Sequence, residues 1–306
     1  MITGWSDKPL TVSDHTIVPP WCFFDGVVCD RDRTSLTYAS VLRIDAYLSN
    51  IGSGTLPPSL SNFKNIQQLS LRSLGLVGAI PSSIGSMTSL RHIYLNGNRL
   101  TGTIPDTIGL LTSLELLALD GNELSGATPD AIGSLTSLKY MDLSFNGLTG
   151  TIPDTVGSLT SLQRLYLDEN NLTGPIPETI VSMTSLELLY LNDNKLTGTI
   201  PSSTGLLTSL QLLILSNNLL VGTIPSTFHD LDQLEYLYLD SNYLTMGSAT
   251  TVPTSSFSAT TLASVQHLVL RENCLSFSHN TVSVSGTRCR PAPCKLIKSH
   301  ITSNLL

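Results

Sequence analysis

The sequence predicts an α/β-type solenoid, in which one short unit of strand and return segment is stacked on itself many times. A unit of 24 residues recurs in strict register, with copies that begin at Ile66, Leu90, Leu114, Leu138, Leu162, Leu186, Leu210 and Leu234. The chain has 306 residues, of which 41% are hydrophobic and 13% are charged, so it is too apolar to be disordered. A single unit cannot close a core, whereas stacked units bury a continuous one.

The copy at 90–113 shows how each unit is built. The alternation over 93–96 predicts a short strand with one buried face. Pro105 lacks a backbone donor, so a helical return segment is expected to begin after it. Successive strands should pair in parallel, about 4.8 Å apart. A ninth copy at Val265, after about seven extra residues, and a degraded copy at 41–56 bring the total to about ten.

An asparagine occupies the ninth position of nearly every unit, at the turn where the backbone leaves the strand. These residues are Asn98, Asn122, Asn146, Asn170, Asn194, Asn218, Asn242 and Asn273. Buried backbone groups at such a turn need partners, and an inward amide side chain both donates and accepts. We therefore expect a structural column of asparagines that ends at Leu74, where the first well-formed unit lacks one.

The unit L-x-x-L-x-L-x-x-N-x-L-x-G-x-I-P resembles the plant-type leucine-rich repeat over about residues 41–275. This repeat is found in receptor-kinase ectodomains, receptor-like proteins and polygalacturonase inhibitors. The resemblance implies a right-handed superhelix with a concave parallel sheet. It also implies a second short sheet formed by the L-x-G-x-I-P segments.

The flanking segments complete a predicted division into three parts. Residues 1–40 form an N-terminal cap, 41–275 the solenoid with an insertion at about 246–262, and 276–306 a C-terminal cysteine-containing cap and tail. The stretch from Trp21 to Asp30 resembles the N-terminal cap of the family, and this resemblance implies a disulfide between Cys22 and Cys29. Two of Cys274, Cys289 and Cys294 are expected to pair, and which two stays open.

The cysteines bear on compartment and on metal binding. Five cysteines in the caps and none in the regular units favour disulfides in an oxidising compartment. A structural zinc site needs four suitably spaced ligands, and no C-x-x-C pair exists, so we expect neither metal nor cofactor. The chain is therefore predicted to be extracellular or at the cell surface. Its first residues, Met1 to Ser13, lack the pattern of a signal peptide.

Other classes are disfavoured by charge and hydropathy. A net charge of −7 argues against a nucleic-acid partner. No apolar run approaches the roughly 20 residues of a membrane span, so no transmembrane segment is expected. Asn171, in Asn171-Leu172-Thr173, is a candidate glycosylation site, although one such sequon arises easily by chance in this composition.

The predicted ligand surface is the concave face, onto which the second, fourth and sixth residues after each unit's first residue should point. Its aromatic and apolar candidates are Tyr94, Tyr140, Tyr166, Leu188, Tyr190, Leu212, Ile214, Tyr236 and Tyr238. Tyrosine buries much area at low entropic cost, as interface anchors do. The competing interpretation is that duplication of the unit alone spread these residues.

Three carboxylates, Asp120, Asp142 and Asp168, fall in the same outward columns. We expect a solvated acidic patch or one that faces a basic partner. Paired carboxylates can also serve acid–base catalysis or calcium binding, but no enclosing pocket is expected on an open sheet. The phosphate-loop, zincin and hydrolase-elbow motifs are absent from the sequence, so the chain is predicted not to be an enzyme.

The predicted function is recognition of a protein, peptide or cell-wall glycan through the concave face, as in a receptor ectodomain. One alternative is a secreted inhibitor of a cell-wall-degrading enzyme, similar to the polygalacturonase inhibitors, which usually have more cysteines in their caps. Another is a structural protein of a wall or cell surface. Ice binding is a further alternative, because Thr101 with Thr103, Thr149 with Thr151 and Thr197 with Thr199 form threonine pairs before Ile-Pro.

Overall fold

The computed structural model describes residues 54–245 and Asn273 in full and, as backbone, the strand residues 27–29, 41–45, 267–269, 276–278 and 281–283. The five cysteine side chains and the predicted insertion at 246–262 lie outside the described residues. The three-part division of the chain therefore stays a prediction.

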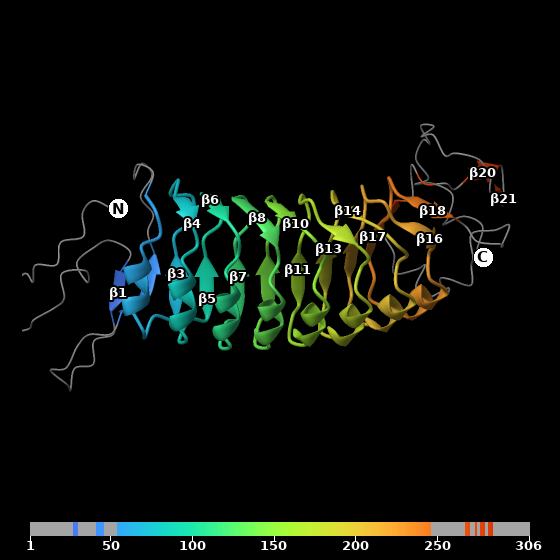
Figure 1. Cartoon of the computed structure of the whole chain (residues 1–306). Helices are drawn as coiled ribbons and strands as arrows, with labels where there is room; N and C mark the ends of the chain where they lie inside the picture. Colours follow the sequence, from blue (N-terminus) through green and yellow to red (C-terminus); the bar gives the residue numbers. More distant parts are fainter. Residues whose placement is uncertain are drawn as a thin grey trace, which may run out of the picture.

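One long sheet forms a continuous face of the molecule (Figure 1). Its strands, in spatial order, are β1 (Val27–Cys29), β2 (Val41–Asp45), β3 (Gln68–Ser70), β5 (His92–Tyr94), β7 (Leu116–Ala118), β9 (Tyr140–Asp142), β11 (Arg164–Tyr166), β13 (Leu188–Tyr190), β15 (Leu212–Ile214), β17 (Tyr236–Tyr238) and β19 (His267–Val269). Every pair is parallel except β1–β2. Leu165 pairs with Leu189, one unit later, so equivalent positions line up across the sheet. The predicted α/β-type solenoid is confirmed.

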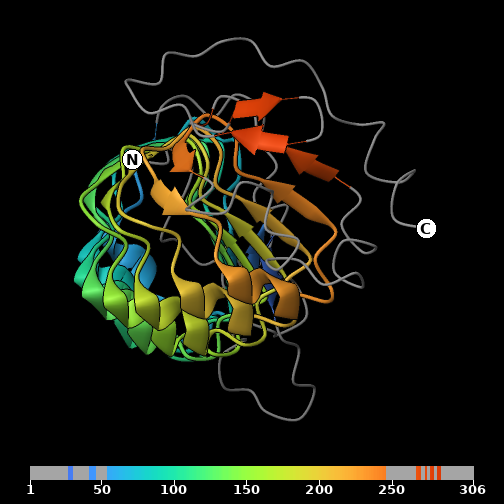
Figure 2. The same ribbon diagram turned by 90° about the vertical axis from the view of Figure 1, so that its right-hand side faces the viewer.

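The return segments are 3₁₀ helices, and each follows a proline. They are η2 (Pro58–Asn62), η3 (Ser82–Ser86), η4 (Asp106–Leu110), η5 (Asp130–Ser134), η6 (Asp154–Ser158), η7 (Glu178–Ser182), η8 (Ser202–Leu206) and η9 (Ser226–Asp230). As expected, η4 begins directly after Pro105. Successive helices stack so closely that a Cβ on Gly133 would collide with the carbonyl oxygen of Thr155. The helices, the strands of the long sheet and the strands of a second sheet occupy different sides of the coil (Figure 2).

The implied second sheet is present, in three pieces. The strands β4 (Val77–Ala79), β6 (Arg99–Gly102), β8 (Glu123–Ala127) and β10 (Gly147–Thr149) form the largest piece. The other two pieces pair β12 (Thr173–Gly174) with β14 (Lys195–Leu196), and β16 (Val221–Thr223) with β18 (Tyr243–Thr245). A separate antiparallel pair joins β20 (Ser276–Ser278) to β21 (Thr281–Ser283).

Pairing in the second sheet is staggered relative to the main sheet. Thr101 pairs with Glu123, and Thr149 pairs with Ala127. Partners are thus 22 residues apart instead of 24. Threonines at equivalent positions of successive units are therefore displaced by two residues along the strand direction. The rows that these threonines form from unit to unit, here called threonine ranks, run obliquely across this sheet.

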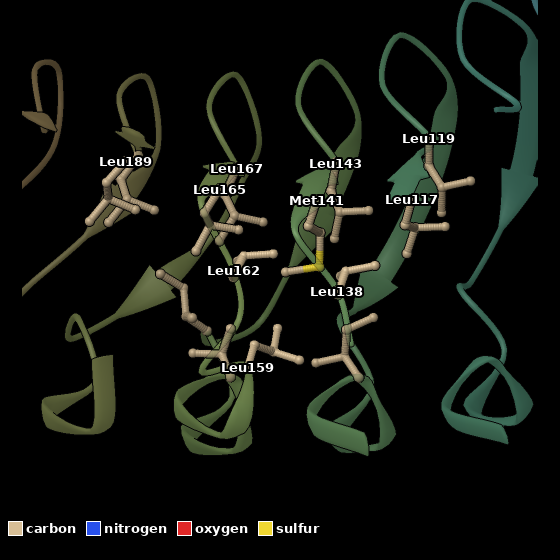
Figure 3. Close-up of a cluster of buried hydrophobic side chains, with 14 of the residues drawn as sticks. Leu117, Leu119, Leu138, Met141, Leu143, Leu159, Leu162, Leu165, Leu167 and Leu189 are labelled. Atoms are coloured by element: carbon tan, nitrogen blue, oxygen red, sulfur yellow. The ribbon is translucent and has the colours of Figure 1, made fainter. Parts of the chain in front are cut away.

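The apolar positions of every unit meet in one continuous core. Figure 3 shows Leu138, Met141, Leu143, Leu162 and Leu165 packed between the main sheet and the helices. Each of these five side chains is at most 1% exposed. Burial of one leucine side chain stabilises the fold by about 1.5–3 kcal/mol. Stacking therefore supplies the stability that a single unit lacks.

The asparagine column is confirmed, and Asn170 illustrates it. Its Nδ2 donates to the carbonyl oxygens of Leu143 (3.0 Å), Leu167 (3.2 Å) and Asp168 (3.1 Å). Its Oδ1 accepts from the backbone N–H of Leu148 at 3.0 Å. One side chain thus links its own unit to the preceding one. This bonding is repeated, in whole or in part, at Asn98, Asn122, Asn146, Asn194, Asn218, Asn242 and Asn273.

The column ends where the sequence predicts, and it continues past the extra residues near the C-terminus. Leu74 is buried and has no amide side chain of its own, and its backbone N–H donates to Oδ1 of Asn98 in the next unit. At the other end, the N–H of Leu244 donates to Asn273 Oδ1 across 29 residues, where the regular bond spans 22. The bond is therefore kept although its partners are seven residues further apart in the sequence than in the regular units.

We expect Asn170→Ala to lower the free energy of unfolding by about 3 kcal/mol, because one buried N–H and three carbonyl groups lose a partner. Urea denaturation of the purified chain measures this change. The neighbouring variant Asn171→Ala removes only a surface bond from Lys195 and should change the free energy by less than about 1 kcal/mol. Equal losses in the two variants would contradict a structural role of the column.

Candidate functional site

The concave face comprises the outward side chains of β3 to β17 and of the residues that follow these strands. The nine predicted aromatic and apolar residues all lie on it and are half-buried: Tyr94, Tyr140, Tyr166, Leu188, Tyr190, Leu212, Ile214, Tyr236 and Tyr238. Parallel pairing places Tyr190 between Tyr166 and Ile214. Tyr94 stands apart from this group, because Ala118 and Asp142 occupy its column on β7 and β9.

Three tyrosines form a stack along the sheet. The ring centroids of Tyr140 and Tyr166 are 5.4 Å apart, and those of Tyr166 and Tyr190 are 4.7 Å apart. The interplanar angles of 43° and 30° and these distances are those of favourable aromatic pairs. Burial raises the pKa of each of the three phenols, so they are neutral at physiological pH and present rings and hydroxyl groups to a ligand.

The carboxylates lie in the expected columns, but two of them are buried and not solvated, so for these two only the alternative of a patch that faces a basic partner stays a prediction. Asp142 is 9% exposed and Asp168 is 8% exposed, whereas Asp120 is half-buried. Asp142 accepts hydrogen bonds from the Tyr140 hydroxyl (2.9 Å) and the Ser144 hydroxyl (2.6 Å). Asp142 is thus surrounded by groups of its own unit, since Tyr140 and Ser144 both donate to its carboxylate.

Burial also changes the acidity of the other two groups. It raises the pKa of Asp120 and that of Asp168 to about 6, and the charge of Asp142 adds to both shifts. The Oδ1 atom of Asp168 is buried and accepts no hydrogen bond. Buried acceptors almost always have a partner, so this oxygen is an exception among the buried side-chain atoms of the described residues.

Arg72 is a residue of this face that the sequence interpretation missed. Its guanidinium carbon lies 3.7 Å from the centroid of the Tyr94 ring, in a cation–π arrangement. Its charge also lowers the pKa of Asp120 and so opposes the effect of burial. Arg72 is the sixth residue after Ile66, and the same counting rule that found the carboxylates would have identified it.

Two other predictions concern metals and membranes. In the part of the chain that the structure describes, no group of three or more histidine, cysteine, aspartate or glutamate side chains is arranged to hold a metal ion. Within the same residues, no helix combines the length and the apolar character needed to span a bilayer.

Asn171 is partly exposed, and its side-chain oxygen accepts a bond from Lys195 Nζ at 2.8 Å. Its glycosylation stays a prediction.

The strands are stacked in parallel, an asparagine column is buried beside them, and their outward side chains form the concave face. These features define a leucine-rich-repeat solenoid. The chain belongs to the leucine rich repeat family, whose model matches residues 64–124, 112–172, 136–196 and 184–244. Its similarity to plant receptor ectodomains makes it a plant-type member. No curated protein matches the chain.

Two of the similar solved structures are plant receptors. The plant peptide hormone receptor RGFR1 in complex with RGF2 is 37% identical, with a TM-score of 0.68 over 72% of this chain and 34% of that one. The ectodomain of the membrane receptor kinase GASSHO1/SCHENGEN3 from Arabidopsis thaliana, in complex with CASPARIAN STRIP INTEGRITY FACTOR 2, is 36% identical, with a TM-score of 0.74 over 83% of this chain and 29% of that one. The chain thus spans about a third of the length of these receptors.

A third similar structure is a plant ice-binding protein. It is 27% identical to this chain, with a TM-score of 0.67 over 82% of this chain and 77% of that one. Its length is therefore matched much more fully than that of the receptors. A relation to the polygalacturonase inhibitors stays a prediction.

Asp168→Asn should raise the free energy of unfolding by about 1–2 kcal/mol at pH 7.5 and leave it unchanged near pH 3.5. The pKa of Asp168 is about 6 in the folded chain against an ordinary value of 3.8. The folded state therefore binds more protons between these values, and its stability falls as the pH rises through them. The neutral amide avoids this loss. Urea titrations at the two pH values measure the difference.

The matched control for this prediction is Asp232→Asn, at an exposed position after η9. Its effect should stay below about 0.5 kcal/mol at both pH values. Destabilisation of the chain by Asp168→Asn at pH 7.5 would show that the ionised carboxylate has favourable partners in the folded protein. That result would contradict a buried Oδ1 without a hydrogen-bond donor.

Proposed function

We propose that this chain is the ligand-recognition region of an extracellular or cell-surface protein and that it binds a peptide or protein through the concave face between β9 and β17. The observation that supports this best is the continuous group of half-buried tyrosine, leucine and isoleucine side chains on these strands. Their outward columns are not part of the core. An apolar surface that the core does not require is typical of a binding site.

The similar structures support this proposal, because two of them are plant receptors solved with their ligands. A solenoid of paired strands is also rigid, so ordering the binding surface costs little entropy. The concave face offers aromatic and apolar area with neutral phenols instead of a nucleophile paired with a histidine base. Recognition is therefore proposed in preference to catalysis, and a cell-wall glycan is the alternative ligand.

The double variant Tyr190→Ala/Tyr238→Ala should weaken binding of the physiological partner at least tenfold, since truncation of interface tyrosines commonly costs about 2 kcal/mol or more. The measurement is a pull-down from secreted proteins and peptides, followed by titration of the captured partner. Tyr243→Ala is the matched control, because Tyr243 is 49% exposed but belongs to β18 of the second sheet. A saturable partner that both variants retain would place the site elsewhere.

The enzyme-inhibitor and structural alternatives make different predictions in the same preparation. An inhibitor would reduce the activity of a polygalacturonase in a dose-dependent manner. A purely structural protein would capture no saturable soluble ligand while remaining folded.

Ice binding is the second candidate, and two observations favour it. The six threonines of the predicted pairs are all exposed, at Thr101, Thr103, Thr149, Thr151, Thr197 and Thr199. The plant ice-binding protein is matched over 77% of its length. Against this candidate, Val77, Ser125, Pro175 and Val221 interrupt the ranks, and the stagger of the second sheet makes them oblique.

Because recognition is favoured, we expect the purified chain to leave the growth of ice crystals unchanged in a thermal-hysteresis measurement. Thr149→Lys/Thr151→Lys and Tyr190→Ala/Tyr238→Ala are measured beside the wild-type chain. Arrest of ice growth that is lost in the threonine variant and kept in the tyrosine variant would replace recognition by ice binding as the function.

A further inference from the structure

Resting on the proposed function, we propose that Tyr166, Tyr190 and Asp168 form a subsite for one basic side chain, an arginine or a lysine, of the bound peptide. This group of three residues is called the cation subsite below. The proposal goes beyond peptide recognition, because it names the chemical group that this part of the concave face selects.

The geometry of the cation subsite follows from the pairing of β11 and β13. Tyr166 and Tyr190 lie opposite each other in the parallel register, with ring centroids 4.7 Å apart and an angle of 30° between the rings. Asp168 follows the end of β11, and its charge raises the pKa of both phenols. Asp168 is also two residues after Tyr166 and so belongs to the same outward face of the sheet. Two aromatic rings and a carboxylate on one part of this face are a combination that binds a guanidinium or an ammonium group well.

Two adjacent acceptors in this region have no donor. The Oδ1 atoms of Asp168 and Asn192 are both buried and accept no hydrogen bond. The two residues occupy equivalent positions in neighbouring units, so they are separated by one strand spacing of about 4.8 Å. A guanidinium group carries five N–H donors on a planar frame and can serve two such acceptors together.

The third acceptor of this kind among the described residues is Asn96 Oδ1, which lies in the same column. Buried side-chain acceptors without a donor are thus confined to the sixth-residue column of the concave face within the described part of the chain. In the turns beside Asp168 and Asn192, the carbonyl oxygens of Leu167 and Leu191 accept from the asparagine column. This contrast indicates that the acceptors are directed at a ligand.

The charges around the cation subsite favour a positive ligand. Asp142, Glu169 and Asp193 are close enough to raise the pKa of Asp168. Arg164 lowers the pKa of the Tyr166 phenol, but it stands at the start of β11, on the far side of Tyr166 from Asp168. The surrounding field is therefore mainly negative, and a bound cation would relieve it.

The protein itself shows how this surface holds a cation. At the N-terminal end of the same face, the Arg72 guanidinium lies over the Tyr94 ring and acts on the Asp120 carboxylate. Tyrosine, aspartate and arginine there form a group supplied by a single chain. The cation subsite repeats the tyrosine and the aspartate, and we infer that the ligand supplies the basic side chain.

The test uses a positional-scanning library of linear hexapeptides on the immobilised full chain, followed by titration of the best single peptide. We expect arginine or lysine to be selected at one position. Replacement of a selected arginine by citrulline, which keeps its shape and loses its charge, should weaken binding about tenfold. For a selected lysine, acetyl-lysine serves the same purpose.

The variants complete a double-mutant cycle. Asp168→Asn should weaken the basic peptide about tenfold and bind the neutral analogue as the wild-type chain does, whereas Asp232→Asn should change neither. The inference is overturned if no basic residue is selected or if the neutral analogue binds the wild-type chain as well as the basic peptide does. It is also overturned if replacing the basic residue by its neutral analogue weakens binding by the same factor in Asp168→Asn as in the wild-type chain. Peptides that bind without a basic residue and depend on Tyr190 and Tyr238 would leave the proposed function intact. A library from which nothing binds would overturn both.

Discussion

The asparagine side chain at the ninth position of each unit is the interaction on which the rest of this molecule depends. Asn218 donates to the carbonyl oxygen of Leu191 in the preceding unit and to that of Leu215 in its own unit, and it accepts from the N–H of Leu196. Each unit is therefore completed only by the next one, which makes the fold linear. Any displacement of one unit against its neighbour would leave several buried groups without partners, so the spacing of the stack is fixed.

A fixed spacing gives the concave face its functional character. Residues of the same column lie one strand apart, and their distances are set by the backbone pairing of the main sheet. The stack of three tyrosines is a direct result, because Tyr166 and Tyr190 are paired in one column and Tyr140 lies diagonally across from Tyr166 in the register of β9 and β11. The surface is thus ordered before a ligand arrives, and little binding free energy is lost in arranging it.

Periodicity was sufficient to predict the features that repeat. Strand positions, the buried leucines, the helix that starts after Pro105 and the end of the asparagine column at Leu74 all follow from local chemistry applied once per unit. The tyrosines of the concave face were found for the same reason, since an outward column is defined by counting from the first residue of each unit.

What could not be predicted depends on residues one unit away. Asp142 has an outward position, and the residues beside it on the adjoining strands, Ala118 on β7 and Tyr166 on β11, are identified only once the register is known. The stagger of the second sheet likewise reflects the packing of whole units and not the sequence of any one of them. Counting along the units would have placed Arg72 on the concave face, but its contact with the Tyr94 ring in the next unit could be found only from the sheet register.

The carboxylates of the concave face show why this surface differs from the core beside it. Folding alone would favour apolar or neutral residues at positions as buried as Asp168, because the ionised carboxylate is poorly solvated there and lacks a donor at Oδ1. Proteins commonly tolerate such destabilising groups where function requires them. The free energy lost at this position is small beside the stability that the many similar apolar layers of the solenoid supply independently of this face. The stability of the repeats therefore permits an unsatisfied acid at the site where a ligand would satisfy it.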